Sequence, residues 1–332
     1  MKASLLVEPG RIEVDDVPTP TPGPDDVRIA VGGVGLCGSD LSVFRGTWDA
    51  PTYPWIMGHE AFGIIEAVGR AVPSTRLGEL VVVEPNITCG RCASCRRGRT
   101  SACTQRQSVG MNRPGSIAEL VVVPTQHAWG VPDGTPEDLV CVEPMTVVET
   151  ALRRLRSPIP PSVLVIGVGA QGSLMCLALQ RRGAEVVVSD IDPERTAFAV
   201  GLGAVALDHR GSDRRFDLIV DTAGTPPAVE LAFARAEVGA TIVELSLEGR
   251  PFELTAQSLV RRQVTLQGSL TYDHPLDFAE SVSRLADESS RAGRIVTDEF
   301  SLDEAQNAFE RAPLAPGKTW IRVAAGLPSR GG

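Results

Sequence analysis

The sequence has little that would point to a membrane or to a nucleic acid. No run of apolar residues approaches the roughly 18 that a transmembrane helix requires. The first residues, Met1 to Leu5, lack the charged and then apolar stretches of a signal peptide. Acidic residues outnumber basic ones by 41 to 32, so the net charge of -9 offers no basic surface to a nucleic acid. We therefore expect a cytoplasmic protein whose partner is a small molecule, with no nucleic acid and no membrane.

Lysine and histidine are scarce as well. Lysine occurs only at Lys2 and Lys318, and arginine carries the remaining positive charge. The chain has four histidines, so only these four residues can supply an imidazole ligand to a metal ion. No internal repeat or low-complexity tract is present.

The length and the composition fit two globular domains. A chain of 332 residues with 43% hydrophobic content can bury two medium cores. Short β-rich runs between Pro and Gly turns, such as Val27 to Val31 and Ile117 to Val123, predict a β-barrel or sandwich-like first domain. After Pro158 to Pro161, apolar strands alternate with helical stretches, which predicts a doubly wound parallel sheet. The terminal segment Trp320 to Val323 reads as a strand that could return to the first domain.

Four cysteines form a C-x2-C-x2-C-x7-C pattern in an Arg- and Gly-rich segment. Four thiolates at this spacing can surround Zn2+ as a tetrahedron with no open position, which is typical of a structural metal site. An iron–sulfur cluster or disulfides are the less favoured alternatives, because the bacterial ferredoxin pattern has a different last gap followed by proline, whereas Thr104 stands here. The predicted ligands are Cys89, Cys92, Cys95 and Cys103.

A G-x-G-x-x-G element lies between a predicted strand, Val163 to Ile166, and a predicted helix. Its glycines permit a tight turn, a close approach to a pyrophosphate and close helix packing. The candidate cofactor-binding residues are Gly167, Gly169, Ala170, Gln171 and Gly172. Asp190 ends the next strand, where a carboxylate would meet the adenosine ribose and repel a 2′-phosphate. NAD is therefore favoured over NADP, although Arg195 could reach the same ribose and weakens that preference.

Other residues could bind a second, catalytic metal ion. Cys37 and His59 offer a thiolate and an imidazole, and a carboxylate from Glu60 or Glu143 would complete three protein ligands with one position open. Taken singly, each has an ordinary structural interpretation. Such a histidine or cysteine is more often a packing residue, and an acid beside a proline is usually solvated. The choice between the two acids stays open.

The order of these motifs resembles the zinc-dependent medium-chain alcohol dehydrogenases, in the polyol and threonine dehydrogenase branch. The resemblance covers nearly the whole chain: Gly58-His59-Glu60, the four-cysteine lobe, Val142-Glu143-Pro144 and the glycine-rich element occur in the order of the family. It implies a GroES-like catalytic domain at 1–146 and 275–332, with a zinc lobe at 86–105, and a Rossmann domain at 147–274. It also implies a homodimer or homotetramer, with the 265–270 region as a candidate pairing edge.

The resemblance also implies roles for single residues. Cys37, His59 and Glu60 match catalytic zinc ligands, and Glu143 matches an acid that approaches the metal or its water. Ser39 matches the hydroxyl that receives the alcohol proton, and Asp40 matches an acid that orients a ligand. Relatives often have histidine where this chain has Ser42, so the outer end of the proton relay is open. Cys141 is expected to be a buried neighbour.

The expected reaction is hydride transfer between a secondary alcohol and NAD. The segment from Cys37 to Pro54, with Trp48 as a possible wall for a ring, resembles dehydrogenases of aminocyclitols such as 2-deoxy-scyllo-inosamine. Polyols, cyclitols and aminocyclitols are thus the favoured substrates, and L-threonine, sorbitol or another sugar alcohol is the alternative. A catalytically silent NAD-binding homologue is the alternative from another class, and it would require a broken metal site.

Overall fold

The computed structural model describes residues 1–324, apart from 210, 212, 248 and 287–291. The chain divides into two compact units, Met1–Glu143 with Asp273–Gly332, and Pro144–Tyr272. The domains expected from the sequence, 1–146 with 275–332 and 147–274, have their boundaries close to these positions. Residues 287–291 and 325–332 of the expected catalytic domain lie outside the described residues.

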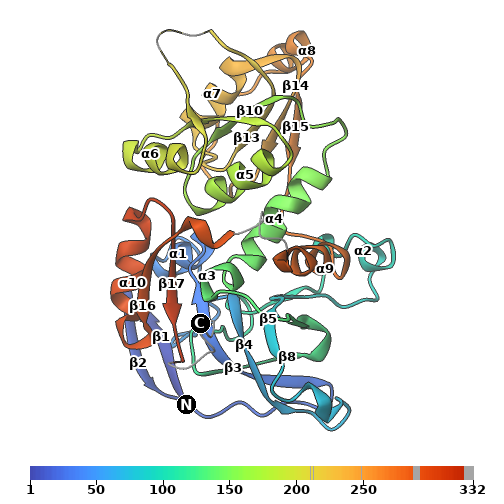
Figure 1. The fold of residues 1–332 in the computed structure, drawn as a ribbon, viewed down its shortest axis with the longest axis vertical. Coiled ribbons are helices and arrows are strands. Elements are labelled where there is room, and N and C mark those ends of the chain that lie inside the picture. The colour runs from blue at the N-terminus through green and yellow to red at the C-terminus, as the bar shows by residue number, and fades with distance from the viewer. Residues whose placement is uncertain (210, 212, 248, 287–291, 325–332) are drawn as a thin grey trace. The chain divides into compact units, whose positions relative to one another are not determined.

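The first unit is built on a sheet of seven strands in the order β16-β17-β3-β4-β5-β9, with β8 also paired to β3. The terminal strand β17 lies antiparallel to β3, so the expected return of the chain end to the first domain is confirmed (Figure 1). The strands are β3 (Asp26–Gly35), β4 (Glu60–Val68), β5 (Leu80–Val83), β8 (Leu120–Pro124), β9 (Ala128–Gly130), β16 (Val296–Ser301) and β17 (Lys318–Arg322).

Valine and isoleucine side chains of these strands form the core of the first unit. Val27, Ile29 and Val81 are fully buried, and Phe309 from a later helix packs into the same cluster. β-branched residues fit the pleated surface of a sheet well, which explains why these runs become strands. A hairpin of β1 (Lys2–Glu8) and β2 (Arg11–Asp16), which the sequence analysis did not predict, adds Leu6 to the core.

Helices and short strands complete the first unit. The helices are α1 (Gly38–Phe44), α2 (Ala93–Arg96), α3 (Pro136–Leu139), α9 (Leu276–Ser283) and α10 (Ala305–Arg311). The short strands β6 (Asn86–Ile87) and β7 (Gln107–Ser108) pair with each other and frame the cysteine-rich segment. The 3-10 turns are η1 (Ser74–Arg76), η2 (Thr100–Ala102), η3 (Thr125–His127), η4 (Arg284–Ala286), η6 (Ala292–Ile295), η7 (Leu302–Glu304) and η8 (Ala312–Leu314).

The second unit is a parallel sheet of six strands in the order β12-β11-β10-β13-β14-β15. The predicted doubly wound parallel sheet is therefore confirmed. Its strands are β10 (Ser162–Ile166), β11 (Glu185–Ser189), β12 (Val205–Ala206), β13 (Phe216–Asp221), β14 (Ala236–Glu244) and β15 (Thr265–Gly268). Its helices are α4 (Val142–Arg153, which begins in the first unit), α5 (Ala170–Arg181), α6 (Pro193–Gly201), α7 (Pro226–Arg235) and α8 (Ala256–Arg262).

The central strands of this sheet are continuous apolar runs because both of their faces are covered. Val163, Leu164 and Val165 of β10 have no exposed surface, as expected for the middle of a parallel sheet. Helix α6 starts where Asp192 accepts a hydrogen bond from the amide of Glu194 and Pro193 occupies the first turn. Within the part of the chain that the structure describes, no helix combines the length and the apolar character that a membrane crossing needs.

Candidate active site and metal centres

Asp40 connects two segments that carry candidate zinc ligands. Cys37 lies just before α1, and its amide donates to Asp40 Oδ2 at 3.0 Å. The other oxygen, Oδ1, accepts from the amide of Gly58 at 3.2 Å. Asp40 is fully buried, so both bonds are shielded from water. The acid thereby holds the Cys37 turn beside the segment of His59.

His59 also lies against this acid. Its Nδ1 is 3.2 Å from Asp40 Oδ1. Burial alone would lower the pKa of His59, but Asp40 and then Cys37 outweigh it and raise that pKa well above its ordinary value. Burial alone would raise the pKa of Asp40, but His59 and the amides of Cys37 and Gly58 hold it below the ordinary range. These negative surroundings favour a positive charge at His59, which a proton or a metal ion can supply.

Cys37, His59 and Glu60 meet at one place in the first unit. Their donor atoms all lie within 4.8 Å of one another. Thiolate, imidazole and carboxylate are the ligands that Zn2+ uses in proteins, and three of them leave a position for substrate. This donor set therefore fits a catalytic zinc ion. Glu143, buried at the start of α4, is not a member of this group among the residues that the structure describes.

Glu60 has a partner that the sequence analysis missed. It is the first residue of β4, and its Oε2 forms a buried ion pair with Nζ of Lys318, the first residue of β17. Lys318 also donates to the carbonyl of Leu36 at 3.2 Å. Burial would lower the pKa of Lys318, but Glu60, Cys141 and Cys37 outweigh it and raise that pKa. The lysine is thus a fixed positive charge beside the candidate zinc ligands.

Gly35 makes room for this ion pair. A Cβ at that position would lie 2.4 Å from Glu60 Oε2 and 2.6 Å from Cε of Lys318, closer than nonbonded atoms can approach. A larger residue at position 35 would therefore have to displace the ends of these two side chains. A possible signal in the sequence was Lys318 itself, because one of only two lysines stands at the start of an apolar terminal strand.

The remaining residues expected near the zinc lie in or beside α1 and α4. Ser39 is the second residue of α1 and is half-buried. The Ser42 hydroxyl donates to the carbonyl of Gly38 at 3.1 Å, so it is engaged within its own helix. Cys141 is fully buried, and burial raises the pKa of its thiol. Among the described residues it does not belong to the group of Cys37, His59 and Glu60, which agrees with its expected place as a neighbour.

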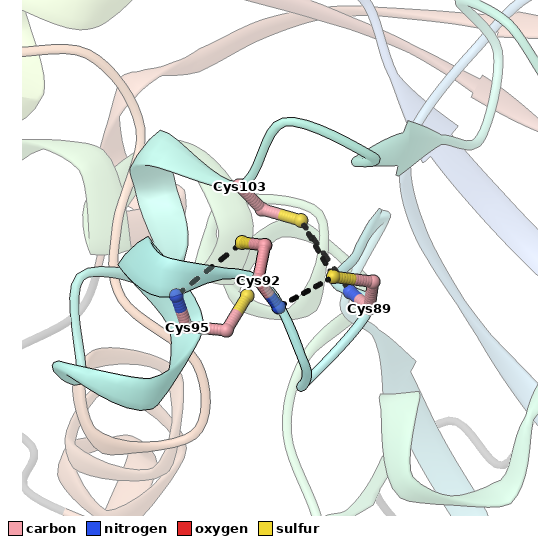
Figure 2. Close-up of side chains that lie close together, drawn as sticks. All are labelled: Cys89, Cys92, Cys95 and Cys103. Atoms are coloured by element: carbon pink, nitrogen blue, oxygen red, sulfur yellow. Dashed lines mark hydrogen bonds between the residues drawn. The ribbon is translucent and has the colours of Figure 1, made fainter.

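The four cysteines of the lobe turn their sulfur atoms toward a common centre (Figure 2). All four sulfurs lie within 4.8 Å of one another. Backbone amides point at these sulfurs: the amide of Cys92 is 3.4 Å from Cys89 Sγ, and the amide of Cys95 is 3.5 Å from Cys92 Sγ. The amides of Cys95 and Thr104 lower the pKa of Cys92 to about 5. Burial and the neighbouring side chains of Cys92 and Cys103 instead raise the pKa of Cys95 to about 12. The convergence of the four sulfurs, with backbone amides directed at two of them, fits the predicted structural zinc.

The glycine-rich element forms the turn between β10 and α5. Gly167 has a φ of +78°, which favours glycine, and Gly169 is the N-cap of α5. A Cβ on Gly172 would lie 2.0 Å from the carbonyl oxygen of Gly167, so the helix can approach the turn only with glycine there. Gln171 donates to the carbonyl of Pro144 at 3.2 Å. The amides at this helix start can bind a pyrophosphate.

Asp190 and Arg195 lie next to this turn. Asp190 follows β11, and its two oxygens accept from the amides of Val168 at 2.7 Å and Asp192 at 2.9 Å. Arg195, on α6, has Nη1 3.8 Å from the position that a Cβ on Gly169 would take. The carboxylate and the guanidinium thus both reach the glycine-rich turn. The carboxylate of Asp190 can accept a hydrogen bond from a ribose hydroxyl, and the guanidinium of Arg195 can bind a phosphate.

Two family models match the chain. The alcohol dehydrogenase GroES-like domain matches residues 23–133, and the zinc-binding dehydrogenase domain matches residues 170–288. The first covers Cys37, His59, Glu60 and the cysteine lobe, and the second begins within the glycine-rich element. The two matches agree with the two units of the fold.

Curated relatives span the whole chain at about the same identity. D-altritol 5-dehydrogenase of Agrobacterium fabrum is 30% identical over 98% of this chain and 100% of its own length. Sorbitol dehydrogenase of Bacillus subtilis is 29% identical over 94% of this chain and 93% of its own. L-threonine 3-dehydrogenase of Proteus mirabilis is 29% identical over 93% of this chain and 96% of its own length.

Solved structures have the same fold. RspB from Escherichia coli CFT073, in complex with NADH, has a TM-score of 0.89 at 28% identity and covers 97% of this chain and 99% of its own. A zinc-binding dehydrogenase from Sinorhizobium meliloti 1021, bound to NADP, has a TM-score of 0.88 at 27% identity, with coverage of 97% and 98%. The chain therefore belongs to the zinc-dependent medium-chain alcohol dehydrogenases, in the branch of the polyol and threonine dehydrogenases.

Proposed function

We propose that this protein is an NAD-dependent zinc alcohol dehydrogenase that acts on a secondary alcohol of a polyol, cyclitol or aminocyclitol. The observation that carries the proposal is the group of Cys37, His59 and Glu60, whose donor atoms converge within 4.8 Å in a chain of this family. The proposed reaction converts the alcohol and NAD into a ketone, NADH and a proton.

Each residue near the metal has a distinct task. Cys37, His59 and Glu60 hold the zinc ion, which when bound supplies the Lewis acidity that makes an alcohol hydroxyl acidic. Asp40 keeps His59 in place through the contact at 3.2 Å. Ser39 receives the hydroxyl proton and passes it to solvent. Glu143, which lies outside the ligand group, serves as the nearby acid and not as the third ligand.

Ser42 cannot serve as the outer end of a proton relay. A serine hydroxyl does not change its protonation state near neutral pH, so it cannot store a relayed proton as an imidazole can, and here it donates to the carbonyl of Gly38. We therefore assign the exit of the proton to water or to a ribose hydroxyl of the cofactor. This exit distinguishes the chain from relatives that use a histidine at this position.

NAD is the proposed cofactor. Asp190 is ionisable, lies beside the turn of Gly167 to Gly172 and would repel a 2′-phosphate. Arg195 favours the opposite choice, and structures of relatives contain NADH in one case and NADP in another. We place more weight on Asp190, because its carboxylate is held by two backbone amides and stays beside the ribose position.

The substrate assignment rests on the relatives and on the segment after Cys37. Relatives of similar identity are named for D-altritol, sorbitol and L-threonine, of which the first two are polyols. Trp48 packs partly buried against the core, where it could contact the ring of a substrate.

We also propose a cytoplasmic homodimer or homotetramer that pairs through β15, an edge strand on which Leu266 is 38% exposed.

The test is a screen of cofactor reduction at 340 nm. NAD and NADP are each offered with altritol, sorbitol, scyllo-inositol, 2-deoxy-scyllo-inosamine and L-threonine, using protein whose zinc content has been measured. The proposal expects turnover with NAD and at least one polyol or aminocyclitol. Turnover confined to L-threonine would contradict the substrate class, and turnover confined to NADP would contradict the cofactor. No turnover at full zinc content would favour the silent homologue.

A further inference from the structure

Three side chains from separate segments of the first unit meet at a place that the proposed reaction does not use. Glu84 directly follows β5, His127 ends η3, and His274 stands two residues before α9. Their donor atoms lie within 4.8 Å of one another. Two of the four histidines in the chain are thus gathered around a single acid.

Polar atoms at this place are buried without hydrogen bonds. Glu84 and His127 have no exposed surface. Neither ring nitrogen of His127 has a hydrogen-bond partner, and neither does Oε1 of Glu84. Leaving a buried polar group unpaired costs about 1 to 3 kcal/mol. Three such atoms at one point are atoms that a bound water molecule or an ion would satisfy.

The other contacts of the group hold its members in place. Glu84 Oε2 accepts from Nε1 of Trp129 at 2.7 Å and lies 2.8 Å from Nδ1 of His274. His127 Nδ1 is 3.6 Å from the same oxygen, too far for a hydrogen bond. The two imidazole rings stack with their centres 4.5 Å apart. The free oxygen of Glu84 and the free ring of His127 are therefore available to a ligand at once, whereas Nδ1 of His274 already contacts Glu84 Oε2.

We propose that Glu84, His127 and His274 bind a divalent transition-metal ion, with zinc as the expected species, as a third metal site separate from the two described above. Two imidazoles and one carboxylate are a donor set that zinc accepts, whereas magnesium and calcium prefer oxygen ligands alone. Bonding through Oε1 leaves Oε2 to Trp129, so the tryptophan becomes an outer partner that orients the acid.

Glu84, His127 and His274 need only small movements to bind one zinc ion. Donor atoms around one zinc ion lie about 3 to 4 Å apart, because each bond is about 2.0 to 2.2 Å long. The donor atoms of the three residues already lie within 4.8 Å of one another, so any movement of the rings that binding requires is small. His127 can move without breaking a hydrogen bond. The His274 side chain is 18% exposed, which leaves one side of the site open to an entering ion.

An ion bound by these three residues would stabilise the position of the cysteine lobe. His274 and Thr100 exchange two hydrogen bonds, at 2.6 and 3.3 Å, and the amide of Ser101 donates to Asp273 at 2.8 Å. Thr100 in turn accepts from the amide of Cys103, a predicted ligand of the structural zinc. The proposed ion would thus join β5, the turn before β9 and the segment that supports the lobe, and its role would be structural.

The test compares the zinc content of three proteins after saturation and removal of loosely bound metal. His127→Gln should contain one zinc equivalent fewer than the wild type. His209→Gln is the matched control, because His209 lies in the second unit, contacts Ser189 at 3.3 Å and belongs to none of these groups. It should contain the same amount of zinc as the wild type.

Cobalt substitution separates this site from the others and reports on folding. A decrease in d–d absorption from that of the wild type in His127→Gln and in His274→Gln, with the thiolate-to-cobalt charge-transfer bands of the cysteine-containing sites intact, would support the site in a folded protein. Equal metal content in the wild type and in both variants would overturn it, and the group would then be a hydrogen-bonded cluster that shares a proton. This comparison measures a difference between variants, so it does not depend on turnover.

Discussion

At the scale of single residues, the least expected finding is the pair of Glu60 and Lys318. The two residues are 258 positions apart and both are about 1% exposed at the side chain. A buried ion pair contributes little net stability when intact, but removing one partner leaves an uncompensated buried charge. Lys318 should therefore matter for stability more than any surface cation of the same strand.

We predict that Lys318→Met lowers the unfolding free energy of the metal-free protein by about 3 to 5 kcal/mol. Arg322→Met is the matched control, because Arg322 lies on the same strand and pairs with Glu299 at the surface. That change should cost no more than about 1 kcal/mol. Chemical denaturation of both variants measures the difference, and equal losses would contradict the role of burial.

The same variant tests which acid binds the zinc. If Glu60 reaches the ion, added zinc should recover part of the stability that Lys318→Met loses, because the cation offsets the carboxylate charge. If Glu143 is the ligand instead, zinc should stabilise the wild type and the variant by the same amount. The readout is the shift of the unfolding midpoint with zinc in each protein.

At the scale of elements, the described part of the cysteine lobe has few regular elements of its own, so the predicted zinc ion should contribute much of its stability. Its helix α2 has four residues, and its strands β6 and β7 have two each. Among the described residues, its contacts with the rest of the unit include the hydrogen bonds of Thr100 and Ser101 to the 273–274 segment. Segments with few buried apolar contacts open easily unless a ligand closes them.

We predict that Cys92→Ser, or treatment with a chelator, makes the lobe at least about tenfold more sensitive to trypsin, which corresponds to about 1.4 kcal/mol in opening free energy. Arginines at 91, 96, 97 and 99 provide the cleavage points. Ser94→Ala, in the same helix, keeps all four thiols and should stay resistant. Cleavage at unchanged rates in Cys92→Ser would show that zinc does not hold the lobe.

The elements themselves were largely readable from the sequence. Strand β5, and strand β10 after Ser162, consist of valine, leucine and isoleucine alone. Asp192 with Pro193 marks the start of α6 as capping rules expect. Helix α4 was missed because no Ser, Thr, Asp or Asn stands directly before Val142 to mark its start. The β1–β2 hairpin was missed because its outer strand is mostly polar and exposed.

At the scale of the whole molecule, contacts between distant segments explain what the sequence could not predict. The motifs identified the candidate zinc ligands Cys37, His59 and Glu60, because each is a ligand type in a known order. The sequence around Lys318 does not identify Glu60 as its partner. The sequence around His127 does not identify Glu84 or His274 either. Such pairs are set by strand order, here by β17 lying beside β3, and are visible only in the folded chain.

The most direct test of the central claim is turnover and cofactor binding measured together in Cys37→Ala and His59→Ala. The cofactor-binding turn and the zinc ligands belong to different units of the fold, so the variants should bind NAD with the wild-type affinity. We predict that alcohol-dependent reduction of NAD falls by a factor of at least about 1,000, or about 4 kcal/mol, because the Lewis acid is lost. Wild-type turnover in either variant would contradict the account.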